Sequence, residues 1–378
     1  MTDAPALPLD GLLVADFSRI LAGPLAGMTL GDLGADVVKV EAPGGDDTRS
    51  WAPPVDAQGR ATYHHAANRN KRSIALDLKD PDDCALARRL CERADVVVSN
   101  FKPGTLERFG LGHGQVAEAN PGVVHCEISG FGEGAGRDLP GYDPLAQAVG
   151  GLMSITGPPG APSKTGVALI DVIAGLYATC AVLAALRERE RSGQGQRVTI
   201  NLLHTTLAAL ANQGTAWLDA GATGGLLGNV HPSIEPFATF RAADGDLMIC
   251  AGNDRQFTAL CEAIGAPGLA ADARFATNAD RVASRDALRP ELERALAARG
   301  CAEWSEALAA AGVPAGPVNP IPEGFALADR LGLGAVDDAD GIRTVAFPAR
   351  LSRTPARTRH RPPDLDEHGA DLRAWLAS

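Results

Sequence analysis

The sequence predicts an α/β protein in which a parallel sheet is covered by helices on both faces and is followed by a second, smaller α+β domain. Two observations support this fold class. Over about the first 200 residues, short β-branched runs alternate with helical ones, which is typical of right-handed βαβ crossovers. After about residue 204 the pattern changes: Asp244-Gly245 joins two short strands as a hairpin signal, and three Ala- and Leu-rich helical stretches occupy residues 253–311.

The elements of the first domain follow in order. The helix expected at 24–33 has Pro24 at its start and Gly34 just past its end, and the helix at 81–93 has Pro81 in its first turn. A long helix runs from Asp171 to about Arg191 and leads to the last strand. Short runs rich in Val, Ile and Leu predict buried strands at 12–17, 36–41, 73–78, 95–100, 123–130 and 197–202.

Composition excludes several classes of function. A net charge of −11 and an aromatic content of 4% argue against nucleic acid or an anionic membrane as a partner. The seven cysteines are odd in number and include no Cys-x-x-Cys pair, so reduced thiols in a cytoplasmic protein are expected. The histidines show no spacing suited to a metal. We expect no signal peptide, and the longest apolar run, at 172–186, is too short to span a membrane.

Asp171 is the main candidate for chemistry. It opens the apolar helical run 171–178, directly after the small-residue stretch 164–170. One interpretation makes it a helix cap, whose oxygen accepts hydrogen bonds from the first turn. The other makes it a nucleophile that attacks an acyl carbonyl and forms a covalent intermediate. Spacing alone favours the cap, because Asp is among the preferred cap residues.

Two groups of basic residues lie in loops beside strands, where ligands of open α/β sheets bind. They are Arg69, Lys71 and Arg72, and then Lys102 and Arg108. Solvated loops and a phosphate-rich ligand are about equally good interpretations. A nicotinamide dinucleotide is not expected, because the first βαβ unit lacks Gly-x-Gly-x-x-Gly.

Six motifs in a fixed order give the chain a family resemblance. They are DFSRILAGP at 16–24, GADVVKVE at 34–41, NKRSIALDLK at 70–79, NFKPG at 100–104, SGFG at 129–132 and GYD at 141–143. With these motifs the chain resembles, over nearly its whole length, the family III CoA-transferases. This group includes formyl-CoA transferase and the carnitine CoA-transferases.

The resemblance implies a Rossmann-like large domain with an inserted smaller α+β domain. The large domain would comprise 1–204 and, after a linker at 205–225 and the small domain at 226–325, a C-terminal return at 326–378. Two such chains are expected to form an interlocked homodimer. Acyl-CoA and carboxylic acids are the implied substrates; no prosthetic group and no metal are expected.

The resemblance also assigns residues. Asp171 falls where the family keeps its nucleophile. CoA-binding positions by matching are Arg19, Leu21, Ala22, Leu76, Asp77, Lys79, Asn100, Phe101, Lys102, Arg108, Tyr142 and Asp143. A substrate lid is expected at Gly224, Gly225, Gly228 and His231, in a Gly-rich segment that is otherwise typical of an interdomain linker. Ala42 and Pro140 replace basic CoA contacts of formyl-CoA transferase, so Arg19, Lys102 or Arg49 are expected to hold the phosphates.

The implied reaction moves CoA from a thioester to a free carboxylate through an aspartyl anhydride and an aspartyl-CoA thioester. Succinyl-CoA is the suggested donor, with Arg49, Arg69 or His231 meeting its distal carboxylate. One alternative is proton transfer of the α-methylacyl-CoA racemase type. That enzyme uses the histidine of a Gly-His-Asp triplet, whereas this chain has Tyr142, whose unperturbed pKa near 10 suits proton transfer poorly. Another alternative is a CoA-binding protein without turnover.

Overall fold

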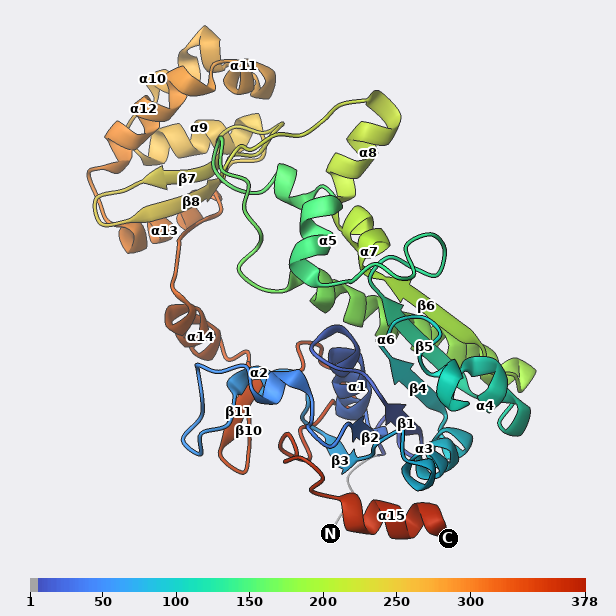
Figure 1. The fold of residues 1–378 in the computed structure, drawn as a ribbon. Coiled ribbons are helices and arrows are strands. Elements are labelled where there is room, and N and C mark those ends of the chain that lie inside the picture. Colours follow the sequence, from blue (N-terminus) through green and yellow to red (C-terminus); the bar gives the residue numbers. More distant parts are fainter. Residues whose placement is uncertain (1–5) are drawn as a thin grey trace. The chain divides into compact units, whose positions relative to one another are not determined.

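In the computed structural model, which describes residues 6–378, six parallel strands form the main sheet (Figure 1). Along the sheet their order is β3-β2-β1-β4-β5-β6. The order reverses between β1 and β4, and open α/β sheets bind their ligands beyond the carboxyl ends of the strands at such a point. The strands are β1 (Leu13–Asp16), β2 (Asp36–Glu41), β3 (Lys71–Ala75), β4 (Val96–Ser99), β5 (Val124–Ser129) and β6 (Arg197–Asn201).

Helices cover both faces of this sheet, as predicted. On one face lie α1 (Ala22–Asp32) and α6 (Leu169–Ser192), and on the other lie α3 (Pro81–Arg93), α4 (His113–Ala119) and α15 (Gly369–Ala377). Successive strand residues point to opposite faces, so Val14 belongs to the core beneath α1 and α6 and Ala15 to the core beneath α3. The sheet is therefore packed on both faces, and this packing holds the ends of its strands in fixed positions.

The long helix α6 begins two residues earlier than predicted, at Leu169, so Asp171 is its third residue. By length and composition α6 is apolar enough to cross a membrane, which corrects the expectation from the shorter apolar run. Half of its most apolar stretch is buried, however, and Ala174, Ala178 and Val182 lie in the core. We therefore interpret α6 as a core helix.

The chain divides into two compact units. Unit 1 comprises residues 1–152, 165–215 and 332–378, and it contains the main sheet and the C-terminal segment. Further elements of unit 1 are α2 (Thr62–His65), α5 (Asp143–Val149), α7 (Leu202–Ala209), β10 (Val336–Ala339) and β11 (Ile342–Val345). The helix α8 (Ala211–Ala220) crosses the boundary between the units.

The C-terminal segment covers the edge strand β3. The main-chain N–H groups of Arg359 and His360 donate to the side-chain oxygen of Asn70, at 2.6 and 3.0 Å. The N–H of His368 donates to the carbonyl of Ser73 at 3.0 Å. Leu372 of α15 is fully buried against the layer that contains α3. This edge of the sheet is thereby closed by residues almost 300 positions later in the chain.

Unit 2 comprises residues 153–164 and 216–331 and is an α+β structure. The predicted hairpin is present, with β7 (Phe237–Arg241) antiparallel to β8 (Asp246–Cys250), and β9 (Ala315–Pro317) pairs with β8. Phe240, Leu292 and Trp304 are among its buried core residues. The helices are α9 (Asp254–Ala263), α10 (Gly268–Ala271), α11 (Asn278–Ala283), α12 (Arg285–Leu296), α13 (Cys301–Ala310) and α14 (Ile321–Arg330).

Candidate active site

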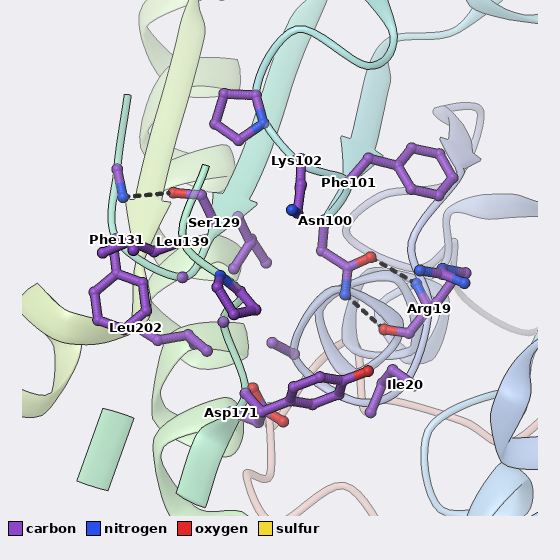
Figure 2. A pocket seen from close by; sticks show the side chains of 18 of the residues that line it. Arg19, Ile20, Asn100, Phe101, Lys102, Ser129, Phe131, Leu139, Asp171 and Leu202 are labelled. Atoms are coloured by element: carbon purple, nitrogen blue, oxygen red, sulfur yellow. Dashed lines mark hydrogen bonds between the residues drawn. The ribbon is translucent and has the colours of Figure 1, made fainter. Parts of the chain in front are cut away.

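A pocket of about 420 Å³ lies where the strand order of the main sheet reverses (Figure 2). All of its lining residues belong to unit 1. Residues 19–22 enter the lining from the connection between β1 and α1, residues 100–103 from the end of β4, and residues 128–132 from the end of β5. The carboxyl ends of three neighbouring strands thus converge on one hollow, as the sheet topology requires of a ligand site.

Asp171 lines this pocket from the first turn of α6. The first turn of a helix leaves N–H groups without intrahelical partners. Here Asp143, the buried first residue of α5, supplies the missing acceptor: its Oδ2 accepts from the N–H of Ile170 at 2.6 Å and of Asp171 at 3.1 Å. The capping function is therefore filled by a residue 28 positions earlier, and the Asp171 carboxylate is not needed for it.

The environment of Asp171 favours a reactive carboxyl group. Among the residues that the structure describes, none donates a hydrogen bond to its side chain or forms an ion pair with it. Burial raises the pKa of Asp171 to about 7, and the negative charge of Asp143 contributes in the same direction. A carboxyl group with a pKa near neutrality is a feature of functional sites, because most structural carboxylates gain donors that lower their pKa.

The turn that follows β1 forms another wall. Asn100 holds it with both polar atoms of its side chain: Oδ1 accepts from the N–H of Arg19 at 2.8 Å, and Nδ2 donates to the Arg19 carbonyl at 2.6 Å (Figure 2). The Arg19 guanidinium lies 5.6 Å from the ring centroid of Phe101. Ile20 has a φ of 70°, in the left-handed region. The amide of Asn100 is thus occupied by the protein main chain.

A buried polar network lies beneath this turn. Lys39 donates to Asp46 Oδ2 at 2.9 Å and to the Ser18 carbonyl at 3.0 Å. A second buried pair joins Lys71 to Asp16 at 2.8 Å. Burial by itself raises the pKa of Asp46, but the charge of Lys39 and hydrogen bonds from Thr48 hold that pKa well below its usual range. We therefore interpret these buried ion pairs as structural, and none of their four residues lines the pocket.

Eight of the residues matched to the family by sequence meet in the pocket lining. They are Arg19, Leu21, Ala22, Asn100, Phe101, Lys102, Tyr142 and Asp171. Five others of unit 1 are not in the lining: Leu76, Asp77, Lys79, Arg108 and Asp143. Leu76 lies in the core beneath α3, and Arg108 donates to Thr105 Oγ1 at 3.3 Å, next to the pocket.

The expected lid residues belong to unit 2. The N–H of Gly228 donates to the Gly157 carbonyl at 3.0 Å, and Nδ1 of His231 accepts from the N–H of Ser233 at 3.1 Å. Gly224 and Gly225 are exposed. The assignment of Gly224, Gly225, Gly228 and His231 to a lid stays a prediction.

Sequence reasoning missed Arg137, which lines the pocket from the loop between β5 and α5 and donates to the Pro103 carbonyl at 3.2 Å. With Arg19 and Lys102 it is the third cation of the lining. The sequence could have indicated Arg137 as a pocket residue, because it lies between the motifs at 129–132 and 141–143, in a loop that follows the carboxyl end of a strand.

Two other arginines that were expected to bind the substrate form ion pairs outside the pocket. Arg49 pairs with Glu41 at 2.7 Å, and Arg69 pairs with buried Asp32 at 2.6 Å. Neither lines the pocket. The site as described can therefore place a polyanion near three cations and an acyl group near Asp171. Within residues 6–378, no cluster of His, Cys, Asp or Glu is arranged to hold a metal ion.

Comparisons with known proteins agree with this arrangement. The family model for CoA-transferase family III matches residues 9–369. The succinate–glutarate CoA-transferase of Agrobacterium fabrum is 44% identical, over 100% of this chain and 98% of the relative. The human succinyl-CoA:glutarate CoA-transferase is 38% identical, over 96% of this chain and 84% of that protein.

Solved structures show the same relationship. The crystal structure of a CAIB/BAIF family protein from Brucella suis superimposes with a TM-score of 0.90 at 43% identity, and the match covers 98% of this chain and 100% of the other. That of Rv3272 from Mycobacterium tuberculosis gives a TM-score of 0.88 at 34% identity, over 97% of this chain and 99% of that one. Family match, relatives and fold agree over nearly the whole chain, which therefore belongs to CoA-transferase family III and is a family III CoA-transferase.

Proposed function

We propose that this enzyme transfers CoA from succinyl-CoA to a second dicarboxylic acid, such as glutarate, and that Asp171 is its nucleophile. The observation that carries the proposal is the unpartnered Asp171 carboxyl group in the pocket, whose pKa is raised to about 7 while Asp143 caps the helix. The choice of substrates follows the names of the two succinyl and glutarate relatives.

The reaction divides into exchanges between carboxylate and thiolate. An oxygen of Asp171 attacks the thioester carbonyl carbon, CoA thiolate leaves, and a mixed anhydride remains. The thiolate then attacks the Asp171 carbonyl, which releases the first acid and forms an aspartyl-CoA thioester. The acceptor carboxylate attacks this thioester, and the thiolate finally attacks the acceptor's carbonyl, regenerating Asp171. An ionised carboxylate is a weak nucleophile, but a fixed position beside the thioester gives it a large effective concentration.

Arg19, Lys102 and Arg137 are proposed to hold the phosphates of CoA. They are the three cations of the lining in a chain whose net charge is −11. Arg137→Ala should raise KM for the acyl-CoA about tenfold, because a charge-assisted hydrogen bond is lost, and Arg137→Lys should recover part of it. Arg72→Ala is the matched control, since it removes a cation that pairs with Asp36 outside the pocket. Equal KM values in the two alanine variants would remove Arg137 from the proposal.

The quaternary arrangement is also a proposal: two chains form an interlocked dimer, each with unit 2 inserted between segments of unit 1. Unit 2 residues 216–331 lie in sequence between unit 1 residues 165–215 and 332–378. Unit 1 also exposes large apolar side chains, among them Leu176 and Tyr177 of α6 and Leu207 of α7. Light scattering should give twice the chain mass of 39.0 kDa, and a monomeric mass for the active enzyme would contradict the arrangement.

Trapping during turnover tests the nucleophile. Hydroxylamine added in the presence of succinyl-CoA and glutarate should convert the peptide containing Asp171 to a hydroxamate, detected by mass spectrometry. An unmodified peptide while glutaryl-CoA accumulates would contradict the covalent mechanism. A panel of CoA donors and acids tests the substrates separately, because failure of every dicarboxylate would remove the substrate class and leave the nucleophile untouched.

A further inference from the structure

The turn after β1 contains an unusual backbone conformation. Ile20 has a φ of 70° and lines the pocket. A β-branched residue in the left-handed region is a genuine outlier, because its Cβ substituents crowd the main chain. Such strain persists only where surrounding groups over-determine the conformation, and it gathers at ligand sites.

One amide side chain and one carboxylate side chain hold this turn in place through hydrogen bonds to its main chain. Asn100 pairs with both the N–H and the carbonyl of Arg19. Asp46 accepts from the N–H of Ile20, at 3.3 Å to one oxygen and 3.2 Å to the other. The first contact fixes the peptide groups on either side of Arg19, and the second fixes the next N–H along the chain. Both contacts thus hold the peptide group that precedes Ile20, while the first turn of α1 holds the chain that follows it, and Ile20 joins the two with a positive φ.

Asp46 is itself held firmly. Its oxygens also accept from Lys39 Nζ at 2.9 Å, from the Thr48 N–H at 3.0 Å and from the Thr48 hydroxyl at 2.8 Å. Lys39 also donates to the carbonyl of Ser18, so the same ion pair holds the turn at a second point. Asp46 is buried and is not part of the pocket lining. Any effect of Asp46 on ligand binding must therefore pass through the turn.

We propose that Asp46 is a positioning residue for acyl-CoA binding: together with Asn100 it holds Ile20 in the left-handed conformation and thereby sets the place of Arg19 and Leu21 in the pocket. This inference rests on the proposed function, in that the pocket is taken as the acyl-CoA site. A turn that is ordered before binding spares the ligand the entropy of ordering it. Asp171 is held separately by the capping contact of Asp143, so the effect falls on KM and leaves kcat nearly unchanged.

Asp46→Asn tests the proposal, because it keeps an acceptor but leaves the buried charge of Lys39 unpaired. We expect KM for the acyl-CoA donor to rise about tenfold, as the strained turn relaxes, while kcat changes less than about twofold. Asp32→Asn is the matched control. Asp32 is also a buried carboxylate of unit 1 with an ion-pair partner, Arg69, but neither residue lines the pocket. Both variants should lose thermal stability, and only Asp46→Asn should raise KM.

A glycine at position 20 shows whether the effect of Asp46 passes through the strained turn. Glycine adopts a positive φ without strain, so Ile20→Gly accepts the conformation without help from Asp46. Adding Asp46→Asn to Ile20→Gly should raise KM only about twofold. In the Ile20→Ala background the side chain is also shortened, but the strain of a positive φ remains. There Asp46→Asn should keep its full effect of about tenfold.

Two outcomes would overturn the inference: equal KM values for Asp46→Asn and Asp32→Asn, or the same loss in the glycine and alanine backgrounds. If Asp46→Asn does not fold, Asp46→Glu gives the same test, with Asp32→Glu as its control. It keeps a negative charge beside Lys39 but lengthens the side chain, so the contact with the Ile20 N–H is disturbed, and glycine at position 20 should again relieve the defect. The comparison uses whichever CoA donor the enzyme turns over. A wrong choice of substrate is therefore detected by the donor panel, and a wrong nucleophile by the trapping experiment. Neither failure changes how the KM values of these variants are compared.

Discussion

Two carboxyl groups of unit 1 differ sharply in pKa, although desolvation acts to raise the pKa of both. Asp46, beneath the turn after β1, receives hydrogen bonds from Lys39 and Thr48, which hold its pKa well below the usual range against the effect of burial. Asp171, in the first turn of α6, receives none within the described residues, and burial together with the charge of Asp143 raises its pKa to about 7. Donors, rather than depth, therefore decide in which direction the pKa of such a carboxyl group moves.

The largest expected effect is on turnover. Asp171→Asn keeps the shape of the side chain but removes the carboxylate that we propose as the nucleophile, so kcat should fall by about ten-thousandfold or more. A CoA-transfer assay measures this, with circular dichroism to show that the variant is folded. Activity within about tenfold of the unmodified enzyme would mean that Asp171 is not the nucleophile and that it has a structural role, like Asp46.

The same change from aspartate to asparagine at Asp46 should lower the free energy of unfolding. Asp46→Asn leaves the fully buried Lys39 charge without its ionic partner, which destabilises by about 3 kcal/mol. Urea unfolding at pH 7 measures this loss. An unchanged midpoint would mean that the ion pair contributes no net stability and that the two carboxylates are more alike than their surroundings indicate.

At Asp171 the effect on stability should have the opposite sign. The pKa of this carboxyl is raised in the folded state from its ordinary value of 3.8 to about 7, so the folded enzyme loses stability as the pH rises through that window. Asp171→Asn has no such titration. The change from 3.8 to about 7 corresponds to about 4 kcal/mol, which the partial exposure of Asp171 to water reduces. The variant should therefore be more stable than the unmodified enzyme by roughly 2 kcal/mol at pH 8, with the difference disappearing near pH 4. Urea unfolding at both pH values decides this, and a variant that is less stable at pH 8 would contradict the raised pKa.

The pH profile gives a further contrast. In the proposed mechanism only ionised Asp171 attacks the thioester, so kcat/KM should fall on the acid side of about pH 7, approaching tenfold per pH unit. Asp143→Asn keeps an acceptor for the helix N–H groups but removes a negative charge, so the midpoint should move to lower pH. A midpoint that stays in place would mean that the charge of Asp143 has no influence on Asp171.

The smallest effect is expected next to Asp46 itself. Asp47 pairs with Arg19 at 3.3 Å, but both side chains are 51% exposed. Asp47→Asn should change the unfolding free energy by less than about 0.5 kcal/mol, because exposed ion pairs are screened by water. A larger loss, measured by urea unfolding, would show that burial is not what distinguishes Asp46 from its neighbour.

The sequence predicted the sheet better than it predicted the roles within the site. Strand and helix signals are local, so the helix at 81–93 was placed correctly, with Asp80 capping it through its own side chain. The cap of α6 is not local, because the acceptor comes from Asp143, and no spacing rule reveals such a contact. For the same reason the motif at 100–104 marked Asn100 as a pocket residue but did not show that its amide is bound to Arg19.

The closure of strand β3 by the C-terminal segment has a consequence for biosynthesis. Asn70 and Ser73 gain their partners in the C-terminal segment only when residues 357–376 have left the ribosome, long after strand β3 itself. Until then the nascent chain presents a bare strand edge, a ready template for unwanted pairing with other chains. A deletion of residues 357–376 should therefore reduce the yield of soluble enzyme through aggregation, even though none of these residues lines the pocket.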